Sequence, residues 1–214
     1  MKLGRYGVIV TGIVVVFFIA ALVFYPQMPE QMASHWNAAG DVDGYMSRFW
    51  GIMLLPLVAV GLAALFALIP RIDPFRVNIE KFKGYYYGFV TAILVFMLYV
   101  YVLTLLWSLG LRFDMGQVLM PAMGILFFAA GVLMGKAKRN FFIGIRTPWT
   151  LSSDEVWERT HRLGAALFKV AGLLVVGGVF FPDYMMWIIM GTILPAAFIP
   201  IVYSYFVWRQ VSSR

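Results

Sequence analysis

Apolar residues fall in long unbroken runs along this chain, and polar residues gather in the segments between the runs. Each run holds roughly 18 to 26 residues, the length that an α-helix rising ~1.5 Å per residue needs to cross a hydrocarbon core of ~30 Å. The pattern predicts six membrane-spanning helices, over residues 7–25, 49–70, 84–109, 116–135, 164–181 and 184–208. We therefore expect an all-α, polytopic integral membrane protein.

Composition supports this fold class and excludes a soluble domain and any site that needs cysteine. The chain is 62% hydrophobic and 13% charged, whereas soluble domains are roughly 45–50% apolar and about 25% charged. The first run exceeds the roughly 7–15 residues of a signal-peptide core and no A-x-A pattern follows it, so we expect a retained helix. Since the sequence has no cysteine, disulfides, thiolate metal sites and cysteine nucleophiles are excluded.

The basic residues are distributed unevenly among the connecting segments. Of the 17 Lys and Arg, fifteen, Lys2 among them, lie in one alternate set of segments or just inside the fifth span, and only Arg48 and Arg112 lie in the other set. The positive-inside rule then predicts that both termini and residues 136–163 are cytoplasmic, with residues 26–48 outside. A cysteine at Ala38 should accordingly be labelled from outside, and one at Ala137 should not. Topology explains the net charge of +7, so we expect no direct nucleic-acid binding.

The predicted spans carry almost no ionisable chemistry. Lys169 is the one ionisable residue inside them, about five residues into the fifth span, where its side chain can snorkel to the interface. His35 and His161 are predicted on opposite sides of the membrane and cannot share a metal ion. No nucleophile has a basic partner within the bilayer. We expect a non-enzymatic protein without a metal or cofactor.

A small-solute or lipid-handling transporter that uses proline-kinked helices is the alternative function. A midplane cavity lined by Thr91, Thr104 and Ser108 would favour transport. A packed bundle with an exposed, ordered outer cap would favour recognition instead.

Residues 26–48, which we call the outer connection, are rich in turn-forming and polar residues. Two prolines, Pro26 and Pro29, force an extended exit from the first span, and Gly40 and Asp43-Gly44 are typical of turns. The side chains that could in principle bind a cation are His35, Asn37, Asp41 and Asp43. They lack the ligand run and distal Glu of an EF-hand. We expect a structured cap over the helix ends, in which His35 and Asn37 bond to backbone groups.

Residues 136–163, the inner connection, predict a helix in their second half. Ser152 and Glu155 have capping-box spacing, so a helix should begin near Ser153 and run toward the fifth span. Its acidic and basic residues form i,i+4 pairs, namely Glu155 with Arg159 and Glu158 with Arg162. A mostly apolar face predicts that it lies at the membrane surface before turning inward.

The first half of the inner connection contains residue types common in binding sites. Gly144, Arg146, Pro148 and Trp149 combine a flexible point, a multidentate donor, a fixed turn and a large aromatic ring within six residues. Arg and Trp are typical binding anchors, or they tie the loop to helix ends or lipid headgroups. If Arg146 is such an anchor, Arg146→Lys should be poorly tolerated, because an ammonium cannot reproduce the planar guanidinium.

The run over residues 140–164 closely resembles the signature of the SdpI family of bacterial membrane proteins, named for immunity to a secreted peptide toxin. The outer connection resembles the domain of unknown function that precedes this signature. The matching inner positions are Asn140, Gly144, Arg146, Thr147, Pro148, Trp149, Ser152, Trp157, His161 and Arg162. The matching outer positions are Pro29, His35, Trp36, Asn37, Gly40 and Gly44, and with Asp41 and Asp43 they form an expected outer recognition loop.

The resemblance implies a multi-pass protein of a prokaryotic cell membrane, with the lipid bilayer as its surroundings. It implies protection against a membrane-active peptide toxin arriving from outside, and recruitment of a soluble repressor inside. It divides the chain into a first helical hairpin (residues 1–70), a middle pair of spans (71–135), and the signature loop, interfacial helix and last two spans (136–214).

Overall fold

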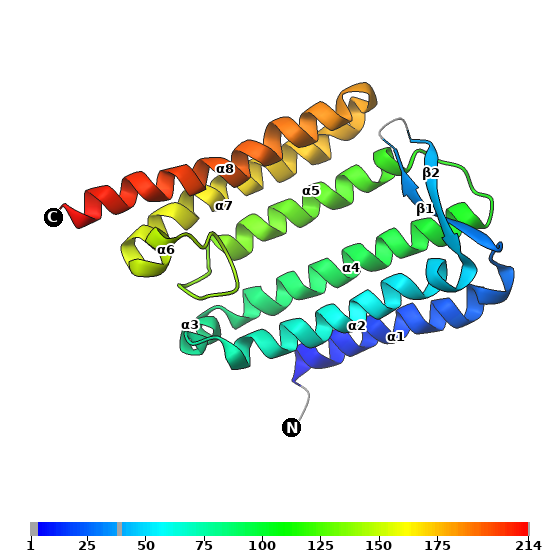
Figure 1. The fold of residues 1–214 in the computed structure, drawn as a ribbon, viewed down its shortest axis with the longest axis horizontal. Coiled ribbons are helices and arrows are strands. Elements are labelled where there is room, and N and C mark those ends of the chain that lie inside the picture. Colours follow the sequence, from blue (N-terminus) through cyan, green and yellow to red (C-terminus); the bar gives the residue numbers. More distant parts are fainter. Residues whose placement is uncertain (1–3, 38–39, 214) are drawn as a thin grey trace. The chain divides into compact units, whose positions relative to one another are not determined.

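The computed structural model describes residues 4–37 and 40–213, so Lys2 and Ala38 lie outside the described residues. Its long helices are α1 (Arg5–Phe24), α2 (Arg48–Ile72), α4 (Lys83–Ser108), α5 (Met115–Met134), α7 (Asp154–Gly177) and α8 (Met185–Ser212) (Figure 1). Short elements are η1 (Tyr25–Gln27), β1 (Gln31–Trp36), β2 (Val42–Ser47), α3 (Arg76–Lys81), α6 (Pro148–Ser152), η2 (Gly178–Phe180) and η3 (Pro182–Tyr184). Within the described residues, 6 helices are long and apolar enough to cross a membrane, which confirms the predicted fold class.

The chain forms two compact units. Unit 1 comprises Met1–Leu65 and Val90–Leu119, and unit 2 comprises Phe66–Phe89 and Met120–Arg214. Helices α2, α4 and α5 therefore each contribute residues to both units.

Unit 1 contains a β-hairpin that the hydrophobic pattern does not reveal. Strands β1 and β2 pair antiparallel, from Gln31 opposite Ser47 to Trp36 opposite Val42, with an irregularity around His35. Met32 and Ala33 of β1 are buried. Met32 packs closely on α2, because a Cβ at Gly51 would lie 2.7 Å from the Met32 Cβ. The outer connection is thus an ordered cap on the helices of its unit (Figure 1).

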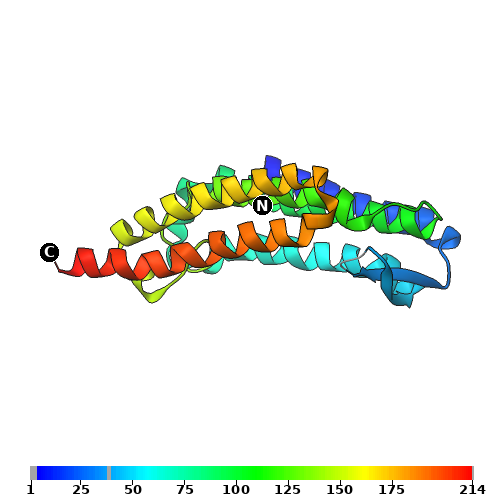
Figure 2. The same ribbon diagram turned by 90° about the horizontal axis from the view of Figure 1, so that it is seen from above.

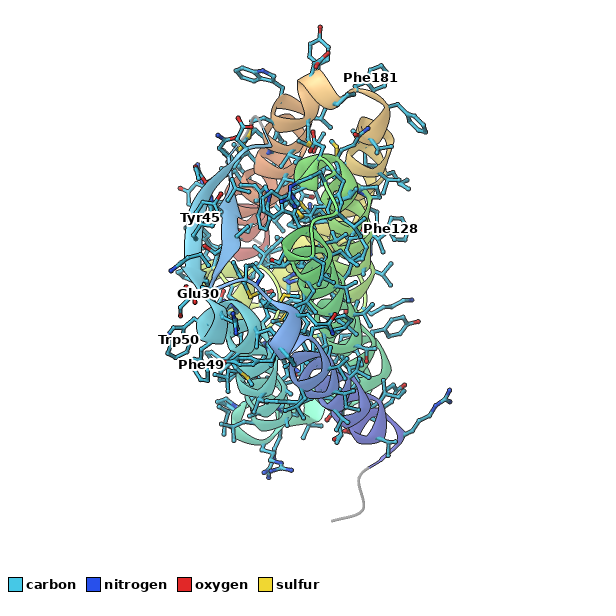
Figure 3. The ribbon with its side chains drawn as sticks, turned by 90° about the vertical axis from the view of Figure 1, so that its right-hand side faces the viewer. Glu30, Tyr45, Phe49, Trp50, Phe128 and Phe181 are labelled. Carbon is cyan, nitrogen blue, oxygen red and sulfur yellow. The ribbon has the colours of Figure 1, made fainter. Side chains whose placement is uncertain are left out.

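Aromatic side chains surround the start of α2 on the surface of unit 1. Tyr45 of β2 and the adjoining rings of Phe49 and Trp50 lie on its edge (Figure 3), and all three are exposed. The two α2 rings meet edge to face at 5.3 Å. Such amphipathic rings are typical of the level of lipid headgroups.

Unit 2 is built on the α7–α8 helix pair, which Figures 1 and 2 show running alongside each other. Helix α5 packs against α7 through small residues: a Cβ at Gly124 would lie 2.5 Å from the Gly172 carbonyl, and one at Gly131 would lie 2.9 Å from the Ala165 carbonyl. This close approach of backbones is how membrane helices gain packing energy without a hydrophobic driving force.

The fifth long helix differs from its predicted form. We expected a surface helix from near Ser153 and a span from 164, but α7 is continuous over Asp154–Gly177. Val156, Trp157, Thr160 and His161 are buried. The apolar face of residues 154–163 is therefore buried against protein. This segment continues directly into the span as a single helix, without the turn that we expected.

Candidate functional site

The tip of the outer hairpin is closed by Asn37. Its side-chain oxygen accepts a hydrogen bond from the Asp41 amide at 3.0 Å, while its backbone N–H donates to the Asp41 carbonyl at 2.8 Å and its carbonyl accepts from the Gly40 amide at 3.0 Å. Gly40 has φ +85°, a conformation that glycine adopts without strain. The expected backbone bonding of Asn37 and the turn at Gly40 are confirmed.

His35 is held differently from the prediction. Its Nδ1 lies 2.5 Å from Oδ1 of Asp43, with the two side chains 69% and 47% exposed, so its partner is a carboxylate and not the backbone. Gly44, which we expected in a turn, lies within β2 opposite His35, where a Cβ would be 2.9 Å from the His35 Cβ. The missing Gly44 side chain leaves room for the histidine.

The other outer positions fasten the hairpin within unit 1. Trp36 packs edge to face on Trp107 of α4 with ring centroids 5.7 Å apart, and the Arg112 guanidinium lies 3.9 Å from the Trp107 ring. The Pro29 carbonyl accepts a hydrogen bond from Nε of Arg48 at 3.4 Å.

Four exposed polar side chains lie together near the tip of the hairpin. They are His35, Asn37, Asp41 and Asp43, all exposed, and we call them the outer polar face. No group of three or more His, Cys, Asp or Glu in residues 4–37 and 40–213 is arranged to hold a metal ion.

Asn140 organises the inner connection from a fully buried position, 0% exposed. Its Nδ2 donates to the carbonyls of Lys138 at 2.8 Å and Ile143 at 3.0 Å. Its Oδ1 accepts from the amides of Phe142 at 2.9 Å and Ile143 at 2.6 Å. One side chain therefore replaces the backbone bonds that this irregular loop does not make for itself.

His161 and Trp157 tie α7 to the same loop. The Trp157 indole N–H donates to the Ala137 carbonyl at 2.9 Å, and its ring stacks on His161 at 3.9 Å. His161 Nδ1–H donates to the Trp157 carbonyl at 2.8 Å, and Nε2 accepts from the Ile145 amide at 3.0 Å. Only the neutral ring with its proton on Nδ1 makes both bonds. Gly144, with φ +103°, touches the same ring, because a Cβ there would clash with Nε2 of His161.

Helix α6 joins the inner connection to α8. Thr147 caps α6 in a reciprocal capping box with Thr150, and its hydroxyl lies 3.1 Å from that of Ser204. Trp149 meets Tyr205 edge to face at 5.2 Å. Pro148 occupies the first turn of α6, where its missing N–H costs nothing.

The cap of α7 lies one residue later than the spacing predicted. Ser153 accepts a hydrogen bond from the Val156 amide at 3.4 Å, whereas the Ser152 hydroxyl donates to the Trp149 carbonyl at the end of α6. The Glu155–Arg159 pair is present at 3.6 Å. Glu158 forms its salt bridge with Lys138, at 2.6 Å, and Arg162 interacts with it electrostatically at longer range.

Arg146 makes a smaller contribution than its residue type suggested. It is exposed, and one of its guanidinium nitrogens donates to the Phe141 carbonyl at 2.9 Å. Arg162 is also exposed, on α7.

Several residues that complete this arrangement carry no local sequence signal. Asp73 is buried, and its two carboxylate oxygens accept from the amides of Phe75 at 2.6 Å and Phe141 at 2.9 Å. Asn78 of α3 donates to the Arg139 carbonyl at 2.9 Å. Both contacts span more than sixty residues of sequence. The only feature of the sequence that marked Asp73 was its position as the single aspartate of the basic segment 71–83.

We call the hydrogen-bonded assembly around Asn140, Thr147, Thr150, Trp157 and His161 the inner clasp. It includes Asp73 and Asn78 and joins α3, α6, α7 and α8 of unit 2. Its polar groups are bonded to each other or to backbone. Such an arrangement positions helices. One of its buried members, His161, also lines a groove on unit 2.

Comparison with known proteins finds a family match for the segment that contains the inner connection and another for the segment that contains the outer connection. Residues 136–204 match the SdpI/YfhL protein family, and residues 12–60 match a domain of unknown function, DUF1648. Immunity protein SdpI of Bacillus subtilis (strain 168) is 24% identical over 201 residues, which cover 94% of each chain. The uncharacterized membrane protein YbgB of the same organism is 35% identical over 60 residues, or 28% of this chain and 66% of that protein.

No solved structure matches the chain. The match over residues 136–204 contains the inner clasp positions from Asn140 to Ser204, and the match over residues 12–60 contains the outer hairpin. Together with the six apolar helices, these matches indicate a multi-pass protein of the cell membrane. Residues 136–204 thus match the SdpI/YfhL protein family, and nearly the whole chain is similar to Immunity protein SdpI.

Proposed function

We propose that this protein is a membrane immunity protein that protects its cell from a secreted, membrane-active peptide toxin. The observation that carries the proposal is the similarity to Immunity protein SdpI along 94% of both chains, since it includes the hairpin as well as the clasp. The ordered, exposed hairpin is also the feature expected of recognition. The Thr104 hydroxyl, by contrast, donates to the Val100 carbonyl of its own helix at 3.0 Å. Its proton is therefore not available to bind a transported solute.

The test is deletion of the gene in its own host, followed by exposure of the cells to medium from stationary cultures of the parent strain. Deletion cells should lose membrane potential and viability, and expression of the protein should restore both. If deletion cells keep their membrane potential in that medium and in mixed culture with the parent, the immunity proposal is wrong.

We propose that the outer polar face makes the first contact with the toxin. His35→Ala combined with Asp43→Ala removes the exposed hydrogen-bonded pair without touching Trp36, whose ring packs on Trp107. Protection should fall at unchanged membrane abundance. The matched control is Gln31→Ala with Ser47→Ala, an exposed pair at the other end of the same hairpin. Equal protection by both double variants would contradict this role of the face.

A soluble repressor inside the cell would meet a different surface. The exposed residues of α6 and the turn before it are Arg146, Pro148 and Ser152, and we propose that they form its contact. Trp157 is excluded from such a contact because it is only 1% exposed. Arg146→Ala with Ser152→Ala should abolish membrane recruitment of a fluorescent repressor while protection stays intact, because the bilayer keeps the two partners apart. Loss of both activities together would show one coupled switch.

A further inference from the structure

Unit 2 contains a basic groove beside the inner clasp. The groove has a volume of about 780 Å³ and is lined by the end of α3, the first turn of α4, the end of α5 with the residues that follow it, and one face of α7. Its charged residues are Lys81, Lys136, Lys138, Glu158, Arg162 and Lys169. Five cations therefore face a single carboxylate.

The partners of these cations leave most of their charge unbalanced. Lys138 is paired with Glu158 at 2.6 Å. Lys81 donates to the neutral side chain of Asn78, and the Lys136 ammonium lies 5.7 Å from the centroid of the Tyr85 ring.

Two further cations lie on the α7 wall of the groove. Among the residues that the structure describes, neither Arg162 nor Lys169 has an ion-pair partner within 4.0 Å. Lys169 lies seven residues after Arg162, or about 10 Å further along the helix axis, inside a candidate span. Its ammonium is either carried to the interface by snorkelling of the side chain or neutralised by an anion that enters the groove, because a hydrocarbon core solvates a cation poorly.

Small residues leave space in the groove around Lys169. Gly131, Ala165 and Ala166 line it together with the stem of Lys169, and a Cβ at Gly131 would lie 2.8 Å from Cγ of Lys169. Past Lys169 the same helix exposes Val170, Leu173 and Leu174. The cationic pocket is thus continuous with an apolar helix surface, and an occupant with an anionic head and hydrocarbon chains matches both.

We propose that the basic groove binds the headgroup of an anionic phospholipid, with its phosphate between Arg162 and Lys169 and its acyl chains along the exposed face of α7. Basic pockets between membrane helices are suited to such headgroups. A free phosphate would satisfy the cations but would leave the adjoining apolar surface unused. The inference does not depend on the proposed immunity function, since it concerns only the walls of this groove.

The test uses the purified full-length protein in detergent, with phosphatidylglycerol, phosphatidylcholine or inorganic phosphate added. Native mass spectrometry counts retained lipid, and thermal unfolding measures stabilisation. Phosphatidylglycerol should bind and raise the midpoint, whereas phosphatidylcholine and phosphate should not. Arg162→Gln with Lys169→Gln should weaken phosphatidylglycerol binding roughly 30-fold, on the order of 2 kcal/mol for two cations.

Two control variants make the result decisive. Arg5→Gln with Arg209→Gln removes the same charge from two exposed positions outside the groove and should bind like the wild type. Arg162→Lys with Lys169→Arg keeps the charge and should retain binding, which separates charge loss from misfolding. Equal phosphatidylglycerol binding by the glutamine variant, or equal stabilisation by phosphate alone, would overturn the proposal.

Discussion

Both polar atoms of the Asn140 side chain form hydrogen bonds: its amide nitrogen donates to two carbonyls, and its oxygen accepts from two amides. Asn140→Asp keeps the size and the acceptor but replaces two donor bonds with a carboxylate facing two carbonyls. We expect a loss of about 2–4 kcal/mol, because buried groups left without partners cost about 1–3 kcal/mol each. Thermal unfolding in detergent measures it.

The control for this change is the same substitution in the outer hairpin. The Asn37 oxygen accepts from the Asp41 amide, and an aspartate retains that acceptor. Asn37→Asp should therefore lower the unfolding midpoint less than Asn140→Asp does. If both variants unfold alike, the described donor bonds of Asn140 contribute nothing to stability.

Arg146→Lys gives a second test at the scale of single residues, and the structure reverses the expectation from sequence. Arg146 is exposed and donates to the Phe141 carbonyl, a bond that an ammonium can also make. The change should alter stability by no more than about 0.5 kcal/mol, as is usual for surface substitutions. A strongly reduced membrane abundance would indicate that the planar guanidinium is required after all.

At the scale of elements, the contact between α5 and α7 depends on the absence of side chains. A Cβ at Gly172 would lie 2.5 Å from the Gly124 carbonyl, whereas a Cβ at Gly191 of α8 has open space around it. Gly172→Ala should lower the unfolding midpoint because the helices must separate. Gly191→Ala should hold or raise it, since alanine is favoured over glycine within a helix by about 1 kcal/mol. Equal effects would mean that α5 and α7 are not closely packed.

The sequence predicted the elements well where one signal dominated. Uninterrupted hydrophobicity located all six long helices. The first strand gave no such signal, because the adjacent residues Met32 and Ala33 are both apolar and both buried, which breaks the alternation expected of a strand. The start of α7 was ambiguous, because an amphipathic helix fits a lipid surface and a protein surface equally well. Asp73 could not have been assigned, since its partner Phe141 is 68 residues away.

At the scale of the whole molecule, the predicted orientation in the membrane is open to direct test. The absence of cysteine permits single introduced thiols, and exposed serines offer conservative sites: Ser47 at the end of β2, Ser152 at the end of α6 and Ser212 in α8. An impermeant maleimide added to intact cells should label Ser47→Cys and neither of the others, because the excess of Lys and Arg marks the cytoplasmic side. Permeabilised cells should show all three labelled. Labelling of Ser152→Cys in intact cells would reverse the assignment.

The buried carboxylate of Asp73 also sets an order of events during synthesis. Its second hydrogen-bond donor, the amide of Phe141, lies 68 residues further along the chain. At about 5–20 residues per second, the ribosome needs on the order of 3–14 s to produce that donor. During this interval the Asp73 carboxylate lacks one of its two hydrogen-bond donors. Nascent chains arrested before residue 141 should accordingly be degraded faster than those arrested after residue 204, where the last clasp hydroxyl has been added.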